Sequence, residues 1–387
     1  MHSRSGEYMN IVFLRSNPIL PDPRVEKEAN TLIGLGYQVR ILAWNRLAVN
    51  KKEVYGEIKV KNGSLPIRWF NIDSSFGSGL KNLLPLLFFQ LCLLSWLIKH
   101  RKEYEIIHAC DFDTVIPAWF CSKLLNKKYV YDIFDYYVDA FHVPRFLKPL
   151  IEKIDIFMIN SANAVIIVNE SRELQISKSR PKKLCVIHNS PDFEIPFEKV
   201  IENERSIFNV NKIKFAYIGI LSDGRLLKEI LEVFQEHQEW ELHIGGFGPY
   251  EEHIKALAEN SINIIFYGRI SYEKVIKIEQ KCHVLFAIYD PDIPNHRYAS
   301  PNKLYEAMLL GKPIIVAKGT GIDETVERFK IGISIEYNGK SFEHAVSELI
   351  KNIEDWSNMK IRTQVIYDEY FAWKIMNKRL TDLYVHL

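Results

Sequence analysis

The sequence predicts an α/β protein made of two similar halves, each a parallel sheet with helices on both faces. Short apolar runs alternate with helical patterns along most of the chain, which is typical of parallel sheets. The alternation stops at a polar, proline-containing stretch, 189–212, and then starts again. The 387 residues are 47% hydrophobic, which is enough for two domains that each bury a core.

The expected elements follow in order along the chain. A strand at 10–14 precedes a loop and a helix at 25–35, which ends at Gly36. The remaining strands of the first half are expected at 38–44, 105–109, 128–132, 164–168 and 184–188. Those of the second half are expected at 214–219, 240–245, 262–268, 283–288, 312–317 and 332–337. An amphipathic helix over 367–387 is expected to pack back onto the first half, so we place one domain at 9–195 with 367–387 and the other at 196–366.

Composition excludes several classes of protein. The net charge is only +2, which gives no electrostatic reason to expect nucleic-acid binding. The five cysteines are scattered without a CxxC pair, so we expect reduced thiols, neither a disulfide framework nor a zinc site, and a cytoplasmic protein. These cysteines are Cys92, Cys110, Cys121, Cys185 and Cys282. Residues 1–8 are polar and do not form a signal peptide, and we leave them out of the fold prediction.

The apolar segment 83–98 raises the question of a membrane. It is shorter than the ~20 residues of a comfortable span, and Pro85 and Gln90 interrupt it. A buried helix is one interpretation. The other is a helix lying in the interface, with the basic run 99–102 facing anionic headgroups, so that the protein is peripheral on the inner face of a membrane and touches it through 83–102.

The segment 300–317, SPNKLYEAMLLGKPIIVA, carries the most informative pattern. Ser300 is a good N-cap and Pro301 a good first helical residue, so a helix is expected to start here with its backbone N–H groups at Asn302 and Lys303 pointing outward. Such a helix end attracts phosphate, and Lys303 adds a full charge. Glu306 lies one turn further on the same side and could accept hydrogen bonds from a ribose diol. A well-capped surface helix is the alternative.

Two further loops leave strands in the second half. Gly219 ends a strand, and Arg225 stands at the following strand–helix junction, where it could bind phosphate or simply face solvent. Gly245, Gly246 and Gly248 permit a tight turn and a close backbone approach, although their spacing is not that of a dinucleotide-binding loop.

Polar residues also follow the strands of the first half. Arg24 could bind an acceptor phosphate or the diphosphate of a donor. Asp111, Asp113 and Asp135 stand at strand ends and are candidates for a general base or for contacts with sugar hydroxyls, as are His108 and Asp132; each could equally be structural.

Two Asp-x-Asp patterns, at 111–113 and 290–292, resemble metal ligands. Carboxylates two positions apart are frequent in loops, and the cations named above could neutralise a leaving group by themselves. We therefore expect no metal and no cofactor.

The order of these motifs resembles that of the family 4 glycosyltransferases and their relatives, which have the GT-B fold of two Rossmann-like domains facing across a cleft. The resemblance covers nearly the whole chain and is densest over 214–327. It rests on the strings YIGIL, LHIGGFGP, IIFYGRISYEKV and SPNKLYEAMLLGKPIIV in the second half, and on PDPRVEKEANTLIGLGYQV, which is similar to the opening of cell-surface polysaccharide enzymes.

The resemblance implies roles for individual residues. Arg225 and Lys303 would bind the diphosphate, Glu306 the ribose, and Arg269 and Ile270 the edge of the base. Gly219, Gly246, Ser300 and Asn302 would complete the donor site.

Two positions depart from the family pattern. Tyr298 stands where the first of two glutamates is common, and Phe134 stands where many relatives have a histidine near the transferred sugar. Tyr298 still belongs to the expected donor site, but the identity of the sugar is open.

The function implied is transfer of a sugar from UDP or GDP to a glycan or lipid-linked acceptor in polysaccharide biosynthesis, retaining and without a metal. In a retaining reaction the departing phosphate could take the acceptor proton; an inverting one would need Asp111, Asp113 or Asp135 as base. A nucleotide-sugar epimerase on the same fold and a non-catalytic binding protein are the alternatives.

Overall fold

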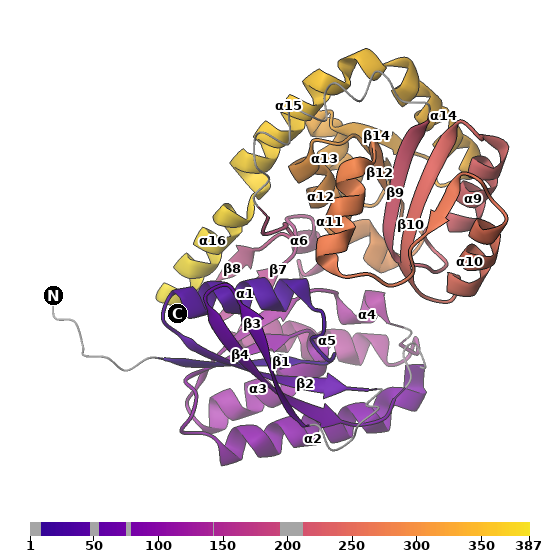
Figure 1. Ribbon diagram of the computed structural model, residues 1–387. Helices are drawn as coiled ribbons and strands as arrows, with labels where there is room; N and C mark the ends of the chain where they lie inside the picture. Colours follow the sequence, from indigo (N-terminus) through magenta and orange to yellow (C-terminus); the bar gives the residue numbers. More distant parts are fainter. Residues whose placement is uncertain (1–8, 47–53, 75–78, 142, 194–211) are drawn as a thin grey trace. The chain divides into compact units, whose positions relative to one another are not determined.

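The computed structural model describes residues 9–46, 54–74, 79–141, 143–193 and 212–387 (Figure 1). The chain forms two compact units. Unit 1 comprises 1–188 and 374–387, and unit 2 comprises 189–373. The first boundary expected from the sequence, between 195 and 196, lies outside the described residues, as do residues 1–8.

Unit 1 is built on a sheet that, within the described ranges, has eight strands in the order β3-β4-β2-β1-β5-β6-β7-β8. These are β1 (Asn10–Arg15), β2 (Gln38–Asn45), β3 (Tyr55–Val60), β4 (Gly63–Asn71), β5 (Ile106–Cys110), β6 (Lys128–Ile133), β7 (Ala164–Ile167) and β8 (Leu184–Val186). All neighbours pair in parallel except β3 and β4, which form an antiparallel hairpin at one edge.

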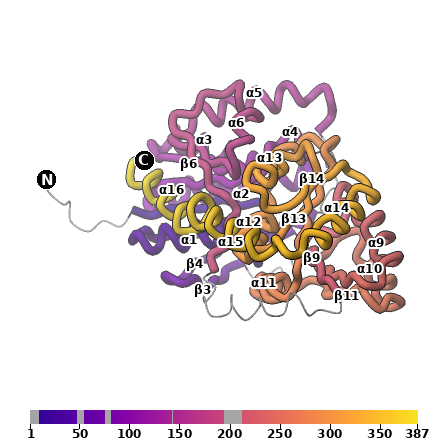
Figure 2. Tube along the Cα trace, turned by 90° about the horizontal axis from the view of Figure 1, so that it is seen from above, coloured from indigo at the N-terminus to yellow at the C-terminus, as the bar shows by residue number. Residues whose placement is uncertain are grey.

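Helices cover both faces of this sheet. They are α1 (Pro23–Gly34), the 3-10 turn η1 (Gly79–Asn82), α2 (Leu83–Lys99), α3 (Phe112–Leu124), α4 (Tyr137–Ala140), α5 (Lys148–Ser161), α6 (Arg172–Gln175) and the C-terminal α16 (Trp373–Val385). One apolar core joins α2, α3 and α5 to one face through Phe89, Val115 and Ile159. Figures 1 and 2 place α16 beside α1, and Tyr384 of α16 contacts both Tyr37 and the β5 residue His108.

Unit 2 has a parallel sheet whose described strands follow the order β11-β10-β9-β12-β13-β14. These are β9 (Ile213–Ile220), β10 (Trp240–Phe247), β11 (Ile264–Phe266), β12 (Val284–Ala287), β13 (Ile314–Ala317) and β14 (Gly332–Ile335). The helices and turns are α9 (Leu227–Glu236), α10 (Glu251–Glu259), α11 (Tyr272–Lys281), η2 (Pro294–Tyr298), α12 (Asn302–Leu310), α13 (Ile322–Phe329), α14 (Gly339–Lys351), η3 (Ile353–Asp355), α15 (Trp356–Ile366) and η4 (Tyr367–Phe371).

Two apolar cores hold unit 2 together. The first packs α9 and α14 on one face of the sheet around Phe234 and Phe342. The second packs α11 and α12 on the opposite face around Ile278 and Met308. Both units are therefore parallel sheets covered by helices on both faces, which confirms the fold class that the alternating pattern predicted.

Several predicted elements differ in detail. The first helix begins at Pro23, because Asp22 accepts a hydrogen bond from Val25 N and caps it. The expected helix over 367–387 starts with a π-helical turn, η4, and α16 follows only from Trp373. The hairpin of β3 and β4 was not predicted.

Candidate functional site

The donor side of the candidate site lies at the carboxyl ends of the strands of unit 2. The loops after β9, β10, β11 and β12 all leave this edge, and α12 begins there. In open parallel sheets this edge is where ligands bind. The residues predicted for the donor come from these loops.

Lys303 is the central cation of this edge. Its side chain is buried at 8% exposure, and its Nζ lies 4.5 Å from the centre of the Tyr217 ring. Within the described part of the chain it forms no salt bridge. Although burial opposes the charge, neighbours that include Tyr217, Tyr289 and Glu306 hold the pKa of Lys303 above its ordinary value. The site therefore contains a buried ammonium ion without a directly paired carboxylate.

Gly219 makes room for this ammonium. A Cβ atom at position 219 would lie 2.6 Å from Lys303 Nζ. Gly246 has a different reason to be glycine, because its φ is +131° and a Cβ there would lie 1.7 Å from the carbonyl oxygen of Gly219. The two glycines let β9 and β10 approach each other closely beside Lys303.

Arg225 brings a second cation to the same place. Its guanidinium lies 4.0 Å above the Tyr289 ring, and Nη1 donates to Nε2 of His296 at 2.9 Å. Since that nitrogen accepts, the proton of the neutral ring is on Nδ1, which donates to the Asp290 carbonyl at 3.1 Å. Lys303 and Arg225 both interact electrostatically with Tyr217. The two cations therefore lie near the same side chain.

The start of α12 differs from the prediction. Pro301 occupies the N-cap position and no side chain caps the helix, so the predicted cap by Ser300 is wrong. Ser300 instead pairs its hydroxyl with Tyr305 at 2.9 Å. Because a proline cap has no side-chain acceptor, the N–H groups of Asn302 and Lys303 are left for a ligand.

The remaining donor candidates take different positions around this edge. Arg269 is exposed beside the Phe247 ring, at 4.8 Å, and Ile270 is half-buried against the α11–α12 core. Tyr298 ends η2, the turn that also contains His296. Glu306 is buried at 2% exposure on α12, one turn beyond Lys303.

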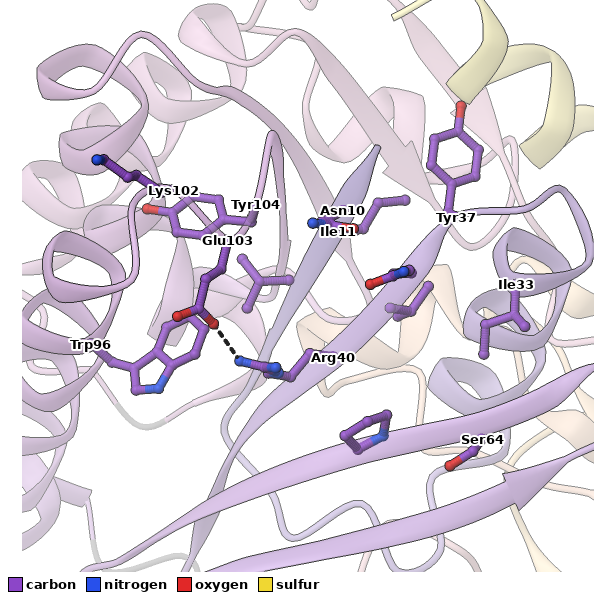
Figure 3. A pocket seen from close by; sticks show the side chains of 14 residues that line it. Asn10, Ile11, Ile33, Tyr37, Arg40, Ser64, Trp96, Lys102, Glu103 and Tyr104 are labelled. Atoms are coloured by element: carbon purple, nitrogen blue, oxygen red, sulfur yellow. Dashed lines mark hydrogen bonds and ion pairs between the residues drawn. The ribbon is translucent and has the colours of Figure 1, made fainter. Parts of the chain in front are cut away.

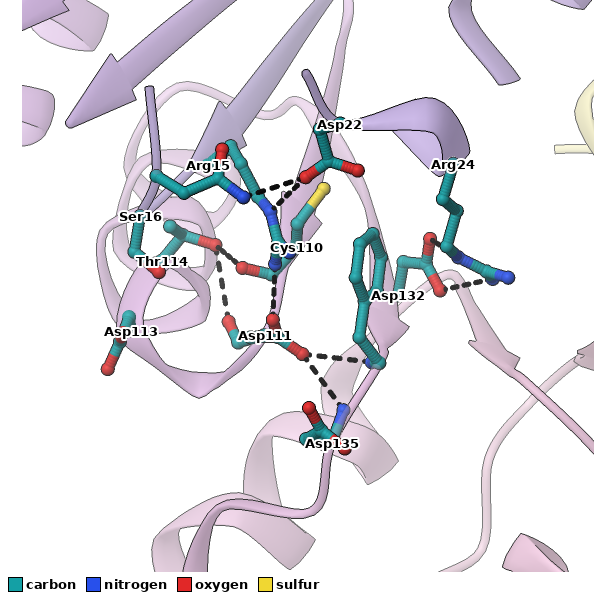
Figure 4. Close-up of polar contacts among 12 residues, drawn as sticks. Arg15, Ser16, Asp22, Arg24, Cys110, Asp111, Asp113, Thr114, Asp132 and Asp135 are labelled. Carbon is teal, nitrogen blue, oxygen red and sulfur yellow. Dashed lines mark hydrogen bonds and ion pairs between the residues drawn. The ribbon is translucent and has the colours of Figure 1, made fainter. Parts of the chain in front are cut away.

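In unit 1, Asp111 is the most constrained of the predicted acids (Figure 4). It has φ +64° at the junction of β5 and α3, and its Oδ1 accepts from the backbone N of Phe134 at 2.9 Å and of Asp135 at 3.2 Å. Its Oδ2 pairs with Arg15. Burial raises the pKa of Asp111 to about 6, and Arg15 opposes that rise.

Asp113 and Asp135 lie nearby but are engaged differently. Asp113 is buried at the start of α3, 3.9 Å from Arg46, and burial raises its pKa. Asp135 is half-exposed and pairs with Arg172 at 3.2 Å. The three acids thus gather at one edge of unit 1, each next to an arginine.

Arg24 is buried beneath this edge. Its guanidinium pairs with Asp132 at 2.9 Å and with Glu28 at 3.2 Å, and donates to the carbonyl of Ile187 at 2.6 Å. These contacts fix α1 to the sheet. The expected contact of Arg24 with an acceptor stays a prediction.

Phe134 and Arg15 lie beside Asp111 in unit 1. The Phe134 ring has the guanidinium of Arg15 4.1 Å from its centre and that of Arg24 at 4.8 Å. Arg15 also pairs with Asp22 at 2.8 Å, so one side chain joins the cap of α1 to Asp111. Arg15 was not among the residues predicted from the sequence, although its place at the end of the first strand was a usable signal.

Comparison with known proteins adds the family. Residues 200–365 match the family of glycosyl transferases group 1. The chain is 24% identical, over 300 residues, to an uncharacterized glycosyltransferase of Haemophilus influenzae, covering 72% of this chain and 78% of the relative. Residues 200–365 therefore correspond to a group 1 glycosyl transferase domain, and the two units of the chain have the GT-B fold.

Solved structures agree on the fold of this glycosyltransferase. A sucrose-phosphate synthase of Thermosynechococcus elongatus is similar with a TM-score of 0.75 and 13% identity, covering 98% of both chains. HepE of Anabaena, solved in complex with UDP and glucose, is similar with a TM-score of 0.72 and 15% identity, covering 98% of this chain and all of that one.

One group of side chains in the glycosyltransferase has the composition of a metal site. Glu28, His108 and Asp132 lie within reach of one another and are fully buried. Arg24 already contacts both carboxylates, and His108 Nδ1 is paired with the Tyr384 hydroxyl. An arginine that pairs with both carboxylates of such a group fits an internal ion-pair network better than a cation site.

The Asp-x-Asp patterns also have local partners. Asp290 Oδ1 accepts from the backbone N of Asp292 at 2.9 Å, which closes a turn. Asp111 is held by Arg15 and two backbone N–H groups as described above. The expectation that the enzyme needs no metal remains a prediction.

A cavity of about 550 Å³ lies away from these residues (Figure 3). It is lined by the amino ends of β1 and β2, including Asn10 and Gln38, and by Trp96 and Tyr104. The predicted catalytic acids follow the opposite, carboxyl ends of the same sheet. The cavity is therefore not part of the candidate active site.

Proposed function

We propose that this glycosyltransferase moves a sugar from a nucleoside-diphosphate sugar, with UDP or GDP as the nucleotide, to a glycan or lipid-linked acceptor in polysaccharide biosynthesis. The observation that carries the proposal is the buried ammonium of Lys303 at the uncapped start of α12. A buried cation without a paired carboxylate is costly unless an anion joins it. A diphosphate is an anion that also uses the N–H groups of a helix end.

The proposed chemistry is stabilisation of the leaving group. Negative charge grows on the diphosphate as the bond to the sugar breaks, and Lys303 and Arg225 are already positioned near one another to meet it. Their two positive charges match the two negative charges of a sugar-linked diphosphate. This match supports a reaction that does not depend on a metal.

The state of the acids in unit 1 supports retention of configuration. Both oxygens of Asp111 are engaged, one by Arg15 and one by two backbone N–H groups, so that neither is directed at an acceptor hydroxyl even though burial raises the pKa of Asp111 to about 6. Asp135 faces Arg172 in the same way. In a retaining reaction the departing phosphate takes the acceptor proton, and none of these carboxylates has to do so.

UDP is the first donor nucleotide to test, because HepE was solved with UDP and with UDP-glucose. The experiment is calorimetric titration with UDP, GDP and ADP and their common sugars, without added metal. We expect one diphosphate to bind selectively, and expect Lys303→Ala and Arg225→Ala each to weaken it by about tenfold or more.

Lys277→Ala is the matched control. Lys277 is exposed on α11 and pairs with Glu273 at 2.6 Å, away from the strand ends. The Lys277→Ala variant should bind the nucleotide as the wild type does. Absence of binding by the wild type to all three nucleotides, with or without magnesium, would favour the non-catalytic alternative; turnover of the donor without an acceptor would favour an epimerase.

The acceptor side includes a surface proposed to lie on a membrane. Five apolar side chains of α2 are exposed at helical spacing, namely Leu83, Leu84 at 77%, Leu87, Phe88 and Leu91. Residues 74–102 contain no acidic residue and end in the basic run 99–102. Among the described residues no helix is both long and apolar enough to cross a bilayer. An exposed apolar face flanked by cations fits the surface of an anionic membrane, from which a lipid-linked acceptor would come.

A further inference from the structure

Glu279 is a fully buried carboxyl group with no assigned role. It lies on α11, and within the described part of the chain neither of its oxygens has a hydrogen-bond partner. The hydroxyl of Tyr272, two turns earlier on the same face of α11, is also buried without a partner. The two helices α11 and α12 share one apolar core, which includes Ile278 and Leu304.

The groups that face Glu279 come from the donor site. Glu306 and Lys303, both on α12, act on Glu279 electrostatically. Tyr272 of α11 and Tyr367 of η4 in turn interact with Glu306. Burial raises the pKa of Glu279 well above its ordinary value, Glu306 raises it further, and Lys303 opposes the rise. Burial and the neighbouring Glu306 therefore both favour the protonated form of Glu279.

A protonated carboxyl group becomes a hydrogen-bond donor. Two ionised carboxylates offer only acceptors and cannot hydrogen-bond to each other, whereas a protonated one can donate to an ionised one. With the proton present, the acceptor at hand is Glu306. One shared proton would also leave a single negative charge beside Lys303, so that the ammonium keeps its attraction for a diphosphate.

We propose that Glu279 is a positioning residue, whose protonated carboxyl group donates to the Glu306 carboxylate and holds it ready for the ribose of the donor nucleotide. The inference rests on the proposed role of Glu306 in the donor site. Glu279 itself touches neither substrate nor the reacting atoms.

The proposal predicts a dependence of nucleotide affinity on pH. As pH rises through the raised pKa of Glu279, the donor proton is lost and a second negative charge appears beside Lys303. Affinity for the diphosphate should therefore fall toward alkaline pH in the wild type. A glutamine at 279 donates through its amide at every pH and never becomes charged.

The test measures the dissociation constant of UDP, or of GDP if UDP does not bind, from pH 6 to 10. We expect Glu279→Gln to bind as the wild type does near neutral pH and to lose less affinity at high pH. Glu279→Leu, which keeps the volume but not the donor, should bind about tenfold or more weakly at all pH values. Glu273→Gln is the matched control, since Glu273 is exposed on the same helix and pairs with Lys277.

The outcomes separate this inference from the proposed function. An unchanged pH profile in Glu279→Gln, or wild-type affinity in a folded Glu279→Leu, would overturn the positioning role. Thermal unfolding of each variant shows whether it is folded. If Glu279→Leu does not fold, the pH profile of Glu279→Gln still decides the test. Glu306→Ala tests the donor site separately, by comparing UDP with 2′-deoxy-UDP. If Glu306→Ala no longer distinguishes UDP from 2′-deoxy-UDP, while the Glu279 variants bind nucleotide as the wild type does, only the inference drawn for Glu279 is refuted.

Discussion

Single residues show how far a sequence pattern specifies a site. Lys303 and Arg24 both follow loops at strand ends, and the sequence predicts a ligand contact for each. The structure gives them different surroundings, because Arg24 pairs with Asp132, 108 positions away, whereas no salt bridge of Lys303 is found in the described residues. A local pattern indicates which residue faces an edge. It does not show which distant carboxylate will neutralise it.

Gly219 provides the sharpest prediction at this scale. In Gly219→Ala the new methyl group would collide with the flexible end of Lys303 and push the ammonium away from its place. The fold should survive, while affinity for the donor diphosphate falls by about tenfold, the value of one charge-assisted hydrogen bond. Calorimetry with the preferred nucleotide, together with a thermal unfolding curve, measures both effects.

Gly246→Ala is the informative comparison, because there the methyl group would meet the backbone of Gly219 and φ is positive. That variant should lose about 2 kcal/mol of stability or more. If Gly219→Ala binds the nucleotide as tightly as the wild type, Lys303 does not contact the diphosphate from its present position.

At the scale of elements, the alternating pattern predicted the buried strands well. β13 is apolar throughout and β1 is apolar between its two ends because helices cover both faces of each strand, and such runs are easily recognised. The hairpin of β3 and β4 was missed although Leu65, Ile67 and Trp69 of β4 are buried at alternate positions. It carries no continuous apolar run, because β3 lies at the edge of the sheet and none of its residues is fully buried. The cap predicted at Ser300 is wrong for another reason, since its hydroxyl pairs with the Tyr305 hydroxyl on the helix that follows.

The C-terminal helix provides a prediction at this scale. The Tyr384 hydroxyl of α16 is the partner of His108 Nδ1 on β5, and both residues are buried. Tyr384→Phe keeps the ring but leaves a buried imidazole nitrogen without that partner, which should cost about 1–3 kcal/mol. Unfolding of unit 1 in urea measures the loss in its free energy of unfolding. Tyr370→Phe, at a half-exposed tyrosine, should change little, and an equal effect of both substitutions would show that the contact does not hold α16 in place.

The whole molecule combines a nearly neutral charge with an uneven surface. A net charge of +2 predicts no general attraction to anionic surfaces, yet α2 and the residues after it concentrate apolar and basic side chains in one region. The sequence showed this composition but left open whether the apolar residues are buried. The structure buries Phe89, Leu93, Trp96 and Leu97 and exposes another stripe of the same helix. The interpretation of 83–98 as a buried helix therefore holds for one face, whereas contact of the exposed face with a membrane stays a prediction.

Binding of the whole protein to lipid vesicles tests what the exposed stripe does. Leu84→Glu with Phe88→Glu should abolish binding to vesicles of phosphatidylglycerol and phosphatidylcholine, because the charges oppose insertion of the helix face. Replacing Lys99, Arg101 and Lys102 by glutamine should weaken binding by up to about a hundredfold, at about 1 kcal/mol for each cation, and only at low salt on anionic vesicles.

Ile262→Glu is the control, since Ile262 in unit 2 is 79% exposed and so matches Leu84. Cosedimentation measures all of them, and a wild type that stays in the supernatant at low salt would remove the membrane from the proposed function while leaving the donor site intact.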